Sequence, residues 1–591
     1  MSKLDELARE EAARRKRARP ARGSARRGPP IDRPGDVDAE DGPQDTAALP
    51  DADEDGRPLI HVQAGKLHEF VGRLEEIFGH ARAKRRPFVT LYRRAGAASL
   101  VRVVRLTDPR AAAGVHYPAD TLLTLGVDAE YLRLLFSRAV GWQTWDRRRK
   151  PAKWVPSDPP MSVCRAFMAA APWQKVPSLR GTVTAPTLRT DGTLLDKPGF
   201  DAATGLLFDP GGVRFPAINP RPSEKDARAA LATVDALLTG FPFVSREARA
   251  VALSALLTGL VRRCLRSAPL FGFDAPKAGS GKTLLASLVA YVATGVAPAL
   301  MNQAEKPEEE RKRLLATLLD APAVVCIDNV SRVLRSDALC TILTEPSWDD
   351  RVLGVSGNAK VSTNVTFLAT GNNLRFFGDL GERALVCRID AGVPEPGERE
   401  FGVNLHEEVP RRRPELVAAC LTIMLAYTVA GSPATPGPRF GRFEDWSRMV
   451  RSPLLWLGCA DPVRTREAVR AVDPERDALL PILAGWPFKK EQTAKEIVQM
   501  ASSEDFLAAL LAIAPTRGRD ERPDATAVGR FLAKHLGRVE EVEVDGQRCR
   551  RRLSSPSVTR KGLRTYAVET EPVAEAVQAD PAEVAARGGL E

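Results

Sequence analysis

Residues 274–283 have the types and spacing that bind a triphosphate. They follow an apolar run at 268–273 and lead into an apolar-periodic run that begins at Leu284. Gly279 and Gly281 lack a Cβ, so the backbone can curl and point successive N–H groups inward, and the amino end of a following helix adds partial positive charge. A strand, a glycine-rich loop and a helix in this order predict a phosphate-binding loop.

Two side chains of this loop have chemical tasks. Lys282 would reach the β- and γ-phosphates as a mobile point charge, and the Thr283 hydroxyl would be a magnesium ligand. Pro276 stands where the pattern G-x-x-x-x-G-K-[ST] has its first glycine, and we expect it to alter the turn that leaves the strand. The expected nucleotide contacts are Lys277, Ala278, Gly279, Ser280, Gly281, Lys282 and Thr283. The alternative is a chance Gly-Lys-Thr in a chain rich in glycine and alanine.

Polar groups end the next two strand-like runs. Residues 323–327 are apolar and lead to Asp328, as expected of a buried parallel strand that delivers a carboxylate to its carboxyl end, where Asp328 would hold magnesium. The run 364–369 leads to Thr370-Gly371-Asn372-Asn373. An amide offers donor and acceptor together, so Asn372, or else Asn373, could orient the attacking water or bind the γ-phosphate. An ordinary buried strand and an ordinary turn are the alternatives.

Two further cations are candidates for action outside their own subunit. Arg383 precedes a strand-like run and could reach a neighbouring γ-phosphate as an arginine finger, whereas Arg388, inside that run, suits a structural salt bridge. Between the two strands above, Gly357-Asn358 predicts a hairpin turn with Lys360 near its tip. In a ring ATPase such a hairpin would project into the pore and hold a phosphate of single-stranded DNA. A solvent-exposed hairpin lysine is the alternative.

The order of these motifs resembles the AAA+/superfamily 3-type helicase ATPases that accompany primases in phages, prophages and plasmids. The resemblance rests on residues 279–283, Asp328-Asn329, the hairpin before residues 370–373, and Arg383, and it covers about 225–400. It implies a homo-hexameric ring that hydrolyses ATP between subunits with Mg²⁺ and moves along DNA, with single-stranded DNA in the pore. A separate primase is a further candidate partner.

One residue departs from that family in a way that matters for chemistry. Many AAA+ ATPases follow the magnesium aspartate with a glutamate that acts as general base, whereas this chain has Asn329, which cannot accept the proton. The first hypothesis is an ATP-dependent DNA helicase or translocase that serves replication of a phage or other mobile element. The second is an ATP-switched DNA-binding regulator or loader with little hydrolysis. The identity of the base is left open.

The composition limits the number of domains, the kind of partner and the compartment that we expect. At 591 residues the chain needs several domains, and its net charge of +11 favours a polyanionic partner, although GC-rich coding is another source of arginine. Its eight cysteines are scattered without a C-x-x-C pair, as is typical of a protein in a reducing compartment. With only six histidines and no Cys/His cluster at ligand spacing, we expect no structural zinc site. No apolar stretch approaches the roughly 20 residues of a membrane span. We expect a soluble, cytoplasmic protein without a membrane partner.

The amino-terminal part divides into three expected regions. Residues 1–57 form a basic and then acidic tail that we expect to be disordered, and 58–150 a small α/β module without the paired carboxylates of a nucleotidyl transferase. Residues 151–224 are a turn-rich connection. Near this boundary aromatic and basic residues mix, namely Trp142, Trp145, Arg147, Arg148, Arg149, Lys150 and Trp154. They could stack single-stranded bases or, alternatively, bury a seam between domains.

We expect an α/β protein of several domains. Its ATPase core, at 225–400, would contain the P-loop and an AAA+-like parallel sheet. We expect a helical lid at 401–485, where Arg448 or Arg451 senses phosphate or forms a surface pair. A winged helix follows at 486–570, and 571–591 is a flexible tail. The expected contacts of the winged helix with duplex DNA are Arg530, Lys534, Arg550, Arg551 and Arg552. A protein-binding winged helix is the alternative.

Overall fold

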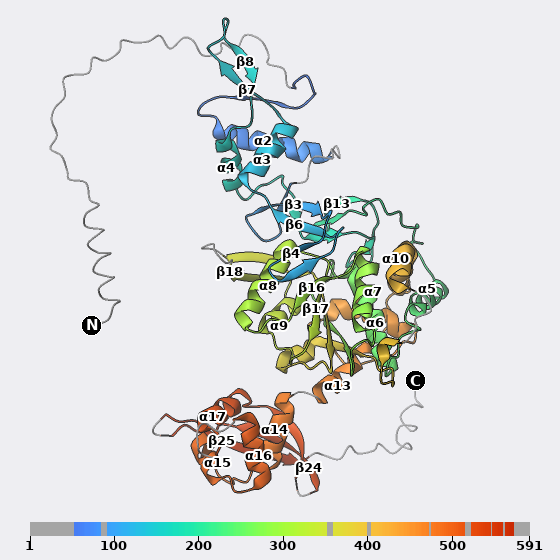
Figure 1. Cartoon of the computed structure of the whole chain (residues 1–591), viewed down its shortest axis with the longest axis vertical. Coiled ribbons are helices and arrows are strands. Elements are labelled where there is room, and N and C mark those ends of the chain that lie inside the picture. Colours follow the sequence, from blue (N-terminus) through green and yellow to red (C-terminus); the bar gives the residue numbers. More distant parts are fainter. Residues whose placement is uncertain are drawn as a thin grey trace, which may run out of the picture. The chain divides into compact units, whose positions relative to one another are not determined.

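The computed structural model describes residues 52–83, 91–351, 358–398, 404–471, 474–514, 522–544, 546–559 and 562–572 (Figure 1). Most of the expected amino-terminal tail, most of the carboxyl-terminal tail and Gly357 of the predicted Gly357-Asn358 turn lie outside these ranges. Residues up to Leu59 form a unit separate from Ile60–Glu591, and in the described part of that unit Arg57 pairs with Asp53 at 2.8 Å.

The central element is a seven-stranded sheet in the order β21-β15-β20-β17-β16-β5-β4. Its five parallel strands are β15 Leu270–Ala275, β16 Ala299–Asn302, β17 Val324–Val330, β20 Thr366–Asn372 and β21 Ala384–Arg388. Antiparallel to β16 runs β5 Val115–Tyr117, followed by β4 Arg110–Ala112. The expected mixed α/β core with a parallel sheet is confirmed, and two strands from within 58–150 extend it.

Both faces of this sheet are buried under helices. Val324 and Cys326 belong to a core shared with α6 Arg246–Val261 and α7 Lys282–Thr294, whereas Val325 and Ile327 belong to a core shared with the helices of the other face. Successive strand side chains point to opposite faces, which explains the continuous apolar runs of the sequence. The helices of that second face are α8 Pro307–Asp320 and α9 Asp337–Thr344 (Figure 1).

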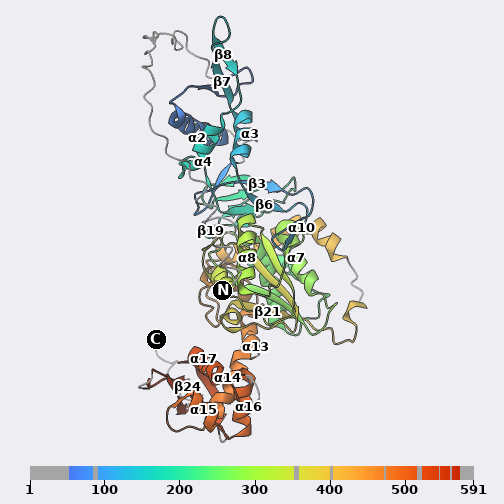
Figure 2. The same cartoon turned by 60° about the vertical axis from the view of Figure 1, so that its left-hand side comes forward.

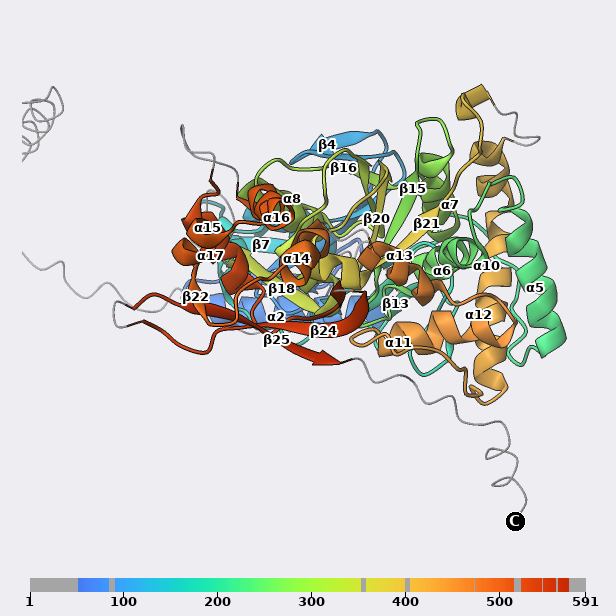
Figure 3. The ribbon, with the colours of Figure 1, turned by 90° about the horizontal axis from the view of Figure 1, so that it is seen from below.

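The helices expected as a lid lie elsewhere. The long helix α10 Leu405–Val429 packs beside α5 Glu224–Ala236 (Figure 3), and Arg413 donates to the carbonyl oxygens of Val292 and Ala293 at the carboxyl end of α7. The helix axis rises about 1.5 Å per residue, so this contact is roughly 15–20 Å from the phosphate-binding loop. This part of α10 therefore lies away from the loop that the expected lid would cover, and α10 adds a layer to the α6/α7 face through its apolar run at 416–427.

The segments after α10 divide among three cores. Those that continue the α6/α7 layer are α11 Glu444–Trp446, η3 Ser447–Arg451, α12 Ser452–Trp456 and η4 Pro462–Arg464. By contrast, α13 Thr465–Ala471 places Val469 against the core of the other face, and α14 Pro474–Ala484 shares a core with Leu510 and Leu532 of the carboxyl-terminal domain. Arg451 forms a buried ion pair with Asp461 at 2.8 and 2.5 Å, and Arg448 pairs with Asp445 at 3.4 Å. Both arginines thus have structural partners, and the pair of Arg451 lies in the interior, not on the surface.

The amino-terminal module combines a helical core with two small sheets. A three-stranded sheet holds β1 Leu59–Val62, β7 Gly141–Asp146 and β8 Lys153–Pro156, and a four-stranded one holds β2 Tyr92–Arg94, β3 Leu100–Arg105, β6 Leu122–Gly126 and β9 Ser178–Leu179. The helices are α2 Leu67–Ala83, α3 Ala129–Ala139 and α4 Met161–Ala169. Their core includes Phe136, Phe167 and Trp142, and α4 is a helix that the sequence pattern did not predict.

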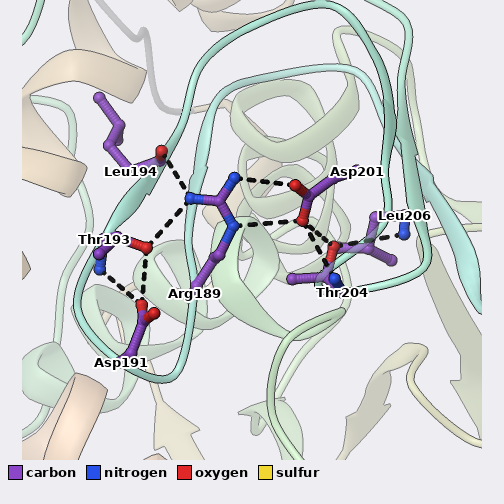
Figure 4. Close-up of polar contacts among 7 residues, drawn as sticks. All are labelled: Arg189, Asp191, Thr193, Leu194, Asp201, Thr204 and Leu206. Atoms are coloured by element: carbon purple, nitrogen blue, oxygen red, sulfur yellow. Dashed lines mark hydrogen bonds and ion pairs between the residues drawn. The ribbon is translucent and has the colours of Figure 1, made fainter. Parts of the chain in front are cut away.

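The turn-rich connection forms the expected short strands. They are β10 Gly181–Val183, β11 Thr187–Leu188, β12 Leu194–Leu195, β13 Gly199–Asp201 and β14 Leu206–Phe208. Figure 4 shows how Arg189 joins the hairpin of β11 and β12 to β13 through two hydrogen bonds to Asp201, at 2.9 and 3.2 Å. The hydrogen bonds from Arg189 lower the pKa of the Asp201 carboxyl. Charge-assisted bidentate pairing therefore orders a segment with little apolar core of its own.

The carboxyl-terminal domain has the helix and strand order expected of a winged helix. Three helices, α15 Ala494–Met500, α16 Glu504–Ile513 and α17 Ala525–Lys534, precede β23 Val539–Val544, β24 Gln547–Ser554 and β25 Thr565–Pro572. The short β22 Gln492–Thr493 pairs with β25. Thr493 caps α15 in a reciprocal bond with Glu496, as its sequence indicates. Within the described ranges, no helix has both the length and the apolar character to cross a bilayer.

Candidate nucleotide-binding site

The expected phosphate-binding loop joins β15 to α7. Gly279 has φ 75° and Gly281, the residue before α7, has φ 99°, a left-handed conformation that glycine adopts without steric cost. Pro276 leaves the strand without a positive φ, so the loop forms despite the missing first glycine. Lys277, Ala278, Gly279 and Thr283 are exposed, and Ser280 is buried. The predicted strand, loop and helix are thus present.

The Lys277 carbonyl occupies the inside of the loop. The Lys282 Nζ donates to this oxygen at 2.7 Å, and the Ser280 hydroxyl donates to it at 2.8 Å. Partial burial lowers the pKa of Lys282, against the opposing charges of Asp274 and Asp328. The amine is therefore held within electrostatic reach of both carboxylates, and a phosphate oxygen could replace the carbonyl as its partner.

Thr370 positions the expected magnesium aspartate. Its hydroxyl donates to Asp328 Oδ1 at 2.6 Å and accepts the Asn329 N–H at 3.0 Å. Between Ile327 and Val330, β17 has one residue more than β20, and such a bulge re-aims the side chains of the bulged strand. Asn329, exposed and with φ 52°, lies in the bulge.

These groups fit a magnesium ion. Mg²⁺ is usually held by one or two protein oxygens together with substrate phosphates. Asp328 is half-buried with one oxygen fixed by Thr370, and Thr283 is exposed in the first turn of α7. Across the part of the chain that the structure describes, no group of three or more His, Cys, Asp or Glu could hold a metal. The donor set thus suits an ion that arrives with a nucleotide.

An ion-pair network ties the neighbouring strand ends together. Asp274, 2% exposed, pairs with Arg388 Nη1 at 2.5 Å and accepts the Leu374 N–H at 2.7 Å. Arg388 also donates to Asn373 Oδ1 at 3.3 Å. The structural role expected for Arg388 is confirmed. Asn372 is exposed beside Ala275, its register partner at the start of the loop, so it stays the stronger candidate of the two amides.

A segment that sequence reasoning missed lies against the loop. Lys277 Nζ donates to the Pro394 carbonyl at 3.2 Å, and a Cβ on Gly279 would lie 3.0 Å from the backbone of Gly397. Gly397 belongs to η2 Pro396–Glu398. Glycine at position 279 allows this approach, whereas a Cβ on Gly397 would lie at an ordinary 3.9 Å. The only sequence signal was Pro-Gly at residues 396–397.

Arg383 is folded against its own subunit. It ends η1 Gly378–Arg383, is 8% exposed, and donates to the Asp379 carbonyl at 2.6 Å. Its guanidinium also pairs with the Asp379 carboxylate at 3.2 Å. In this arrangement the side chain does not extend outward as a finger would.

Lys360 lies in the stem of the predicted hairpin. The strands β18 Ser347–Arg351 and β19 Asn358–Ser362 are antiparallel, and Lys360 is opposite Asp349. Its exposed side chain packs over Gly96, with Cδ 3.4 Å from the position of a Cβ there. The predicted hairpin is therefore present, with Lys360 two residues after the first residue of β19, whereas Asn358, expected in the turn, belongs to that strand.

The expected DNA contacts of the winged helix fall into two groups. Arg530 and Lys534 are exposed on α17, and the Lys534 amine also lies over the Phe377 ring, 4.4 Å from its centroid. The arginines of β24 have protein partners: Arg550 pairs with Glu541 at 2.9 Å, Arg552 pairs with Glu569, and Arg551 donates to the carbonyls of Leu483 and Ala484 at 2.6 and 3.0 Å. Acidic neighbours on β23 and β25 thus balance the charge of the wing.

Comparisons with known proteins find distant structural similarity. No protein-family model matches the chain, and no curated protein matches it. The chain is similar to the apo A-form structure of the NrS-1 C-terminal region, with a TM-score of 0.30 and 11% identity over 79% of this chain and 97% of that one. It is also similar to SCCmec type IV Cch, described as an active helicase, with a TM-score of 0.29 and 12% identity over 74% and 99%. At these TM-scores and sequence identities, the similarity says nothing about the function of this chain.

Proposed function

We propose that this protein is an ATPase that couples ATP hydrolysis to movement along DNA or its unwinding, in the replication of a phage or other mobile element. The observation that carries the proposal is that β15, which leads into the loop, and β17, which carries Asp328, are parallel strands on either side of β20, whose Thr370 hydroxyl donates to the Asp328 carboxylate. A loop cation and a strand-end carboxylate in this relation suit a nucleoside triphosphate with its metal.

Each residue has a task in this proposal. The N–H groups at 278–283 would receive the phosphate oxygens, and Lys282 would move from the Lys277 carbonyl to the β- and γ-phosphates. Thr283 and Asp328 would hold Mg²⁺, which when bound neutralises charge on the phosphates. Asn372 would orient water. Asn329 presents an amide and cannot take the proton from that water, so either Asp328 or another carboxylate would accept it, or hydrolysis would be slow.

DNA and assembly complete the proposal. A homo-hexameric ring would place the β18–β19 hairpin, with Lys360, toward single-stranded DNA and Arg383 toward the next subunit's nucleotide, after release from Asp379. The winged helix would contact duplex DNA through Arg530 and Lys534, both exposed. Because Arg550, Arg551 and Arg552 have protein partners, we assign them a smaller share of that contact.

Steady-state ATP hydrolysis with and without single-stranded DNA tests the proposal. The native chain should hydrolyse ATP faster with DNA, and Lys282→Ala should abolish turnover. Lys312→Ala, an exposed lysine on α8 in the same domain, is the matched control and should leave turnover unchanged. Unchanged turnover in Lys282→Ala would refute the site.

The second candidate function is an ATP-switched DNA-binding regulator or loader, and Asn329 in place of a carboxylate favours it. It predicts ATP-driven oligomers with negligible hydrolysis and no strand separation. A strand-displacement assay combined with size measurement in ATP decides between the two candidates.

A further inference from the structure

Two tryptophans of the amino-terminal module contact each other edge to face across a hairpin. Trp145 on β7 and Trp154 on β8 are register partners, and their ring centroids are 5.3 Å apart at 65° (Figures 1 and 2 show the two strands). His61 extends the cluster, with its ring 4.4 Å from that of Trp154. One face of the β1-β7-β8 sheet therefore presents three aromatic rings, two of them from the hairpin.

These two indoles are not part of the module's core. Trp142 is 3% exposed and donates its N–H to the Phe136 carbonyl at 3.1 Å, and Trp173 is buried in the same way. Trp145 and Trp154 are half-buried, and within the described ranges their ring contacts are with each other and with His61. A buried seam between domains does not account for them.

Positive charge surrounds this aromatic face. The connection from β7 to β8 is exposed and basic, and the first residue of β8 is an exposed lysine. Asp146 offsets part of this charge through Arg149, at 3.4 Å, and accepts the backbone N–H of Arg148 at 3.0 Å. The exposed cations are Arg147, Arg148, Arg149, Lys150 and Lys153. Five cations against one carboxylate make an anionic partner the complementary one.

We propose that the β7–β8 hairpin binds single-stranded nucleic acid, with bases stacked on Trp145 and Trp154 and phosphates held by the cations of the connection. Every base has a π-face, so such a site is tolerant of sequence. Duplex DNA hides those faces and would leave the indoles without partners. The site does not include the nucleotide-binding loop, so this proposal can fail while the proposed ATPase holds, and the reverse.

Photo-crosslinking of the full chain to a short deoxythymidine strand that carries 5-iodouracil tests the site, in the absence of nucleotide. Mass spectrometry should map crosslinks to Trp145 or Trp154. Trp154→Leu should weaken binding of the same strand about tenfold or more, given the energy of base stacking on aromatic rings. Arg165→Ala, an exposed arginine on α4 of the same module, is the matched control and should bind like the native chain.

A second variant keeps the proposal testable if Trp154→Leu does not fold. Arg147 and Arg148 lie in the exposed connection outside the core, so their joint replacement by glutamate should leave circular dichroism unchanged and reduce both affinity and its salt dependence. A strand without bases should bind the native chain as weakly as the intact strand binds Trp154→Leu. Crosslinks confined to other regions, native affinity in both variants, or equal affinity for the baseless strand would overturn the proposal. Binding to anionic vesicles but not to the strand would also overturn it and indicate a membrane site.

Discussion

Replacement of Thr370 by valine removes one hydroxyl and keeps the shape of the side chain. Thr370 is 2% exposed, and its hydroxyl is the group that fixes Asp328 Oδ1 at 2.6 Å. A hydrogen bond to a charged group contributes about 1.5–3 kcal/mol, and removal of such an outer partner typically costs about 10- to 100-fold in metal affinity or activity. We therefore expect Thr370→Val to raise the Mg²⁺ concentration for half-maximal ATP turnover about tenfold or more.

The same strand offers a matched control for that measurement. Thr366 is 1% exposed, and in the described part of the chain its hydroxyl has no hydrogen-bond partner. Thr366→Val should therefore leave the Mg²⁺ dependence unchanged and the unfolding free energy equal or higher. Thr370→Ser, which keeps a hydroxyl, should restore much of the native dependence. A native Mg²⁺ dependence in folded Thr370→Val would refute the role of this hydroxyl.

Three further predictions concern stability and the loop. Folding lowers the pKa of Asp201, so this carboxylate stabilises the folded state above its unfolded pKa of about 3.9, and the stabilisation is lost as the pH falls through the folded pKa. Asp201→Asn should therefore make the free energy of unfolding in urea less dependent on pH across that range. An unchanged pH dependence would contradict this. Gly279→Ala should weaken ATP binding in titration calorimetry about tenfold, because φ is 75° and the backbone of Gly397 is 3.0 Å away, whereas Gly397→Ala, with 3.9 Å available, should bind normally; equal affinities would contradict it. Arg451→Leu leaves Asp461 buried and unpaired at a cost of about 3–5 kcal/mol, so a native unfolding midpoint would count against the pair.

Local patterns predicted the parts of the site that are contiguous in sequence. The loop at 276–281, the helix that follows and the strand before Asp328 depend on residues within a few positions of one another, and the continuous apolar run at 323–327 already indicated burial on both faces. The salt-bridge role of Arg388 was also open to prediction, because its position inside a buried strand demands a partner.

Features that depend on strand order could not be predicted in the same way. Thr370 becomes the partner of Asp328 only because β20 lies between β15 and β17 and because β17 has a bulge, and neither fact has a local signal. The partners of Arg550 and Arg552 lie on adjacent strands, so a count of basic residues overstated the free charge of the wing. The approach of residues 394–397 to the loop is likewise a tertiary contact across more than a hundred residues.

Calorimetric titration of ATP into the native chain and into Asp328→Asn, with and without Mg²⁺, most directly tests whether the loop and this carboxylate form one site. Mg²⁺ should strengthen ATP binding to the native chain, and the variant should still bind ATP but lose the enhancement by Mg²⁺ together with hydrolysis. Equal enhancement and native turnover in Asp328→Asn would contradict a shared site for the nucleotide and its metal.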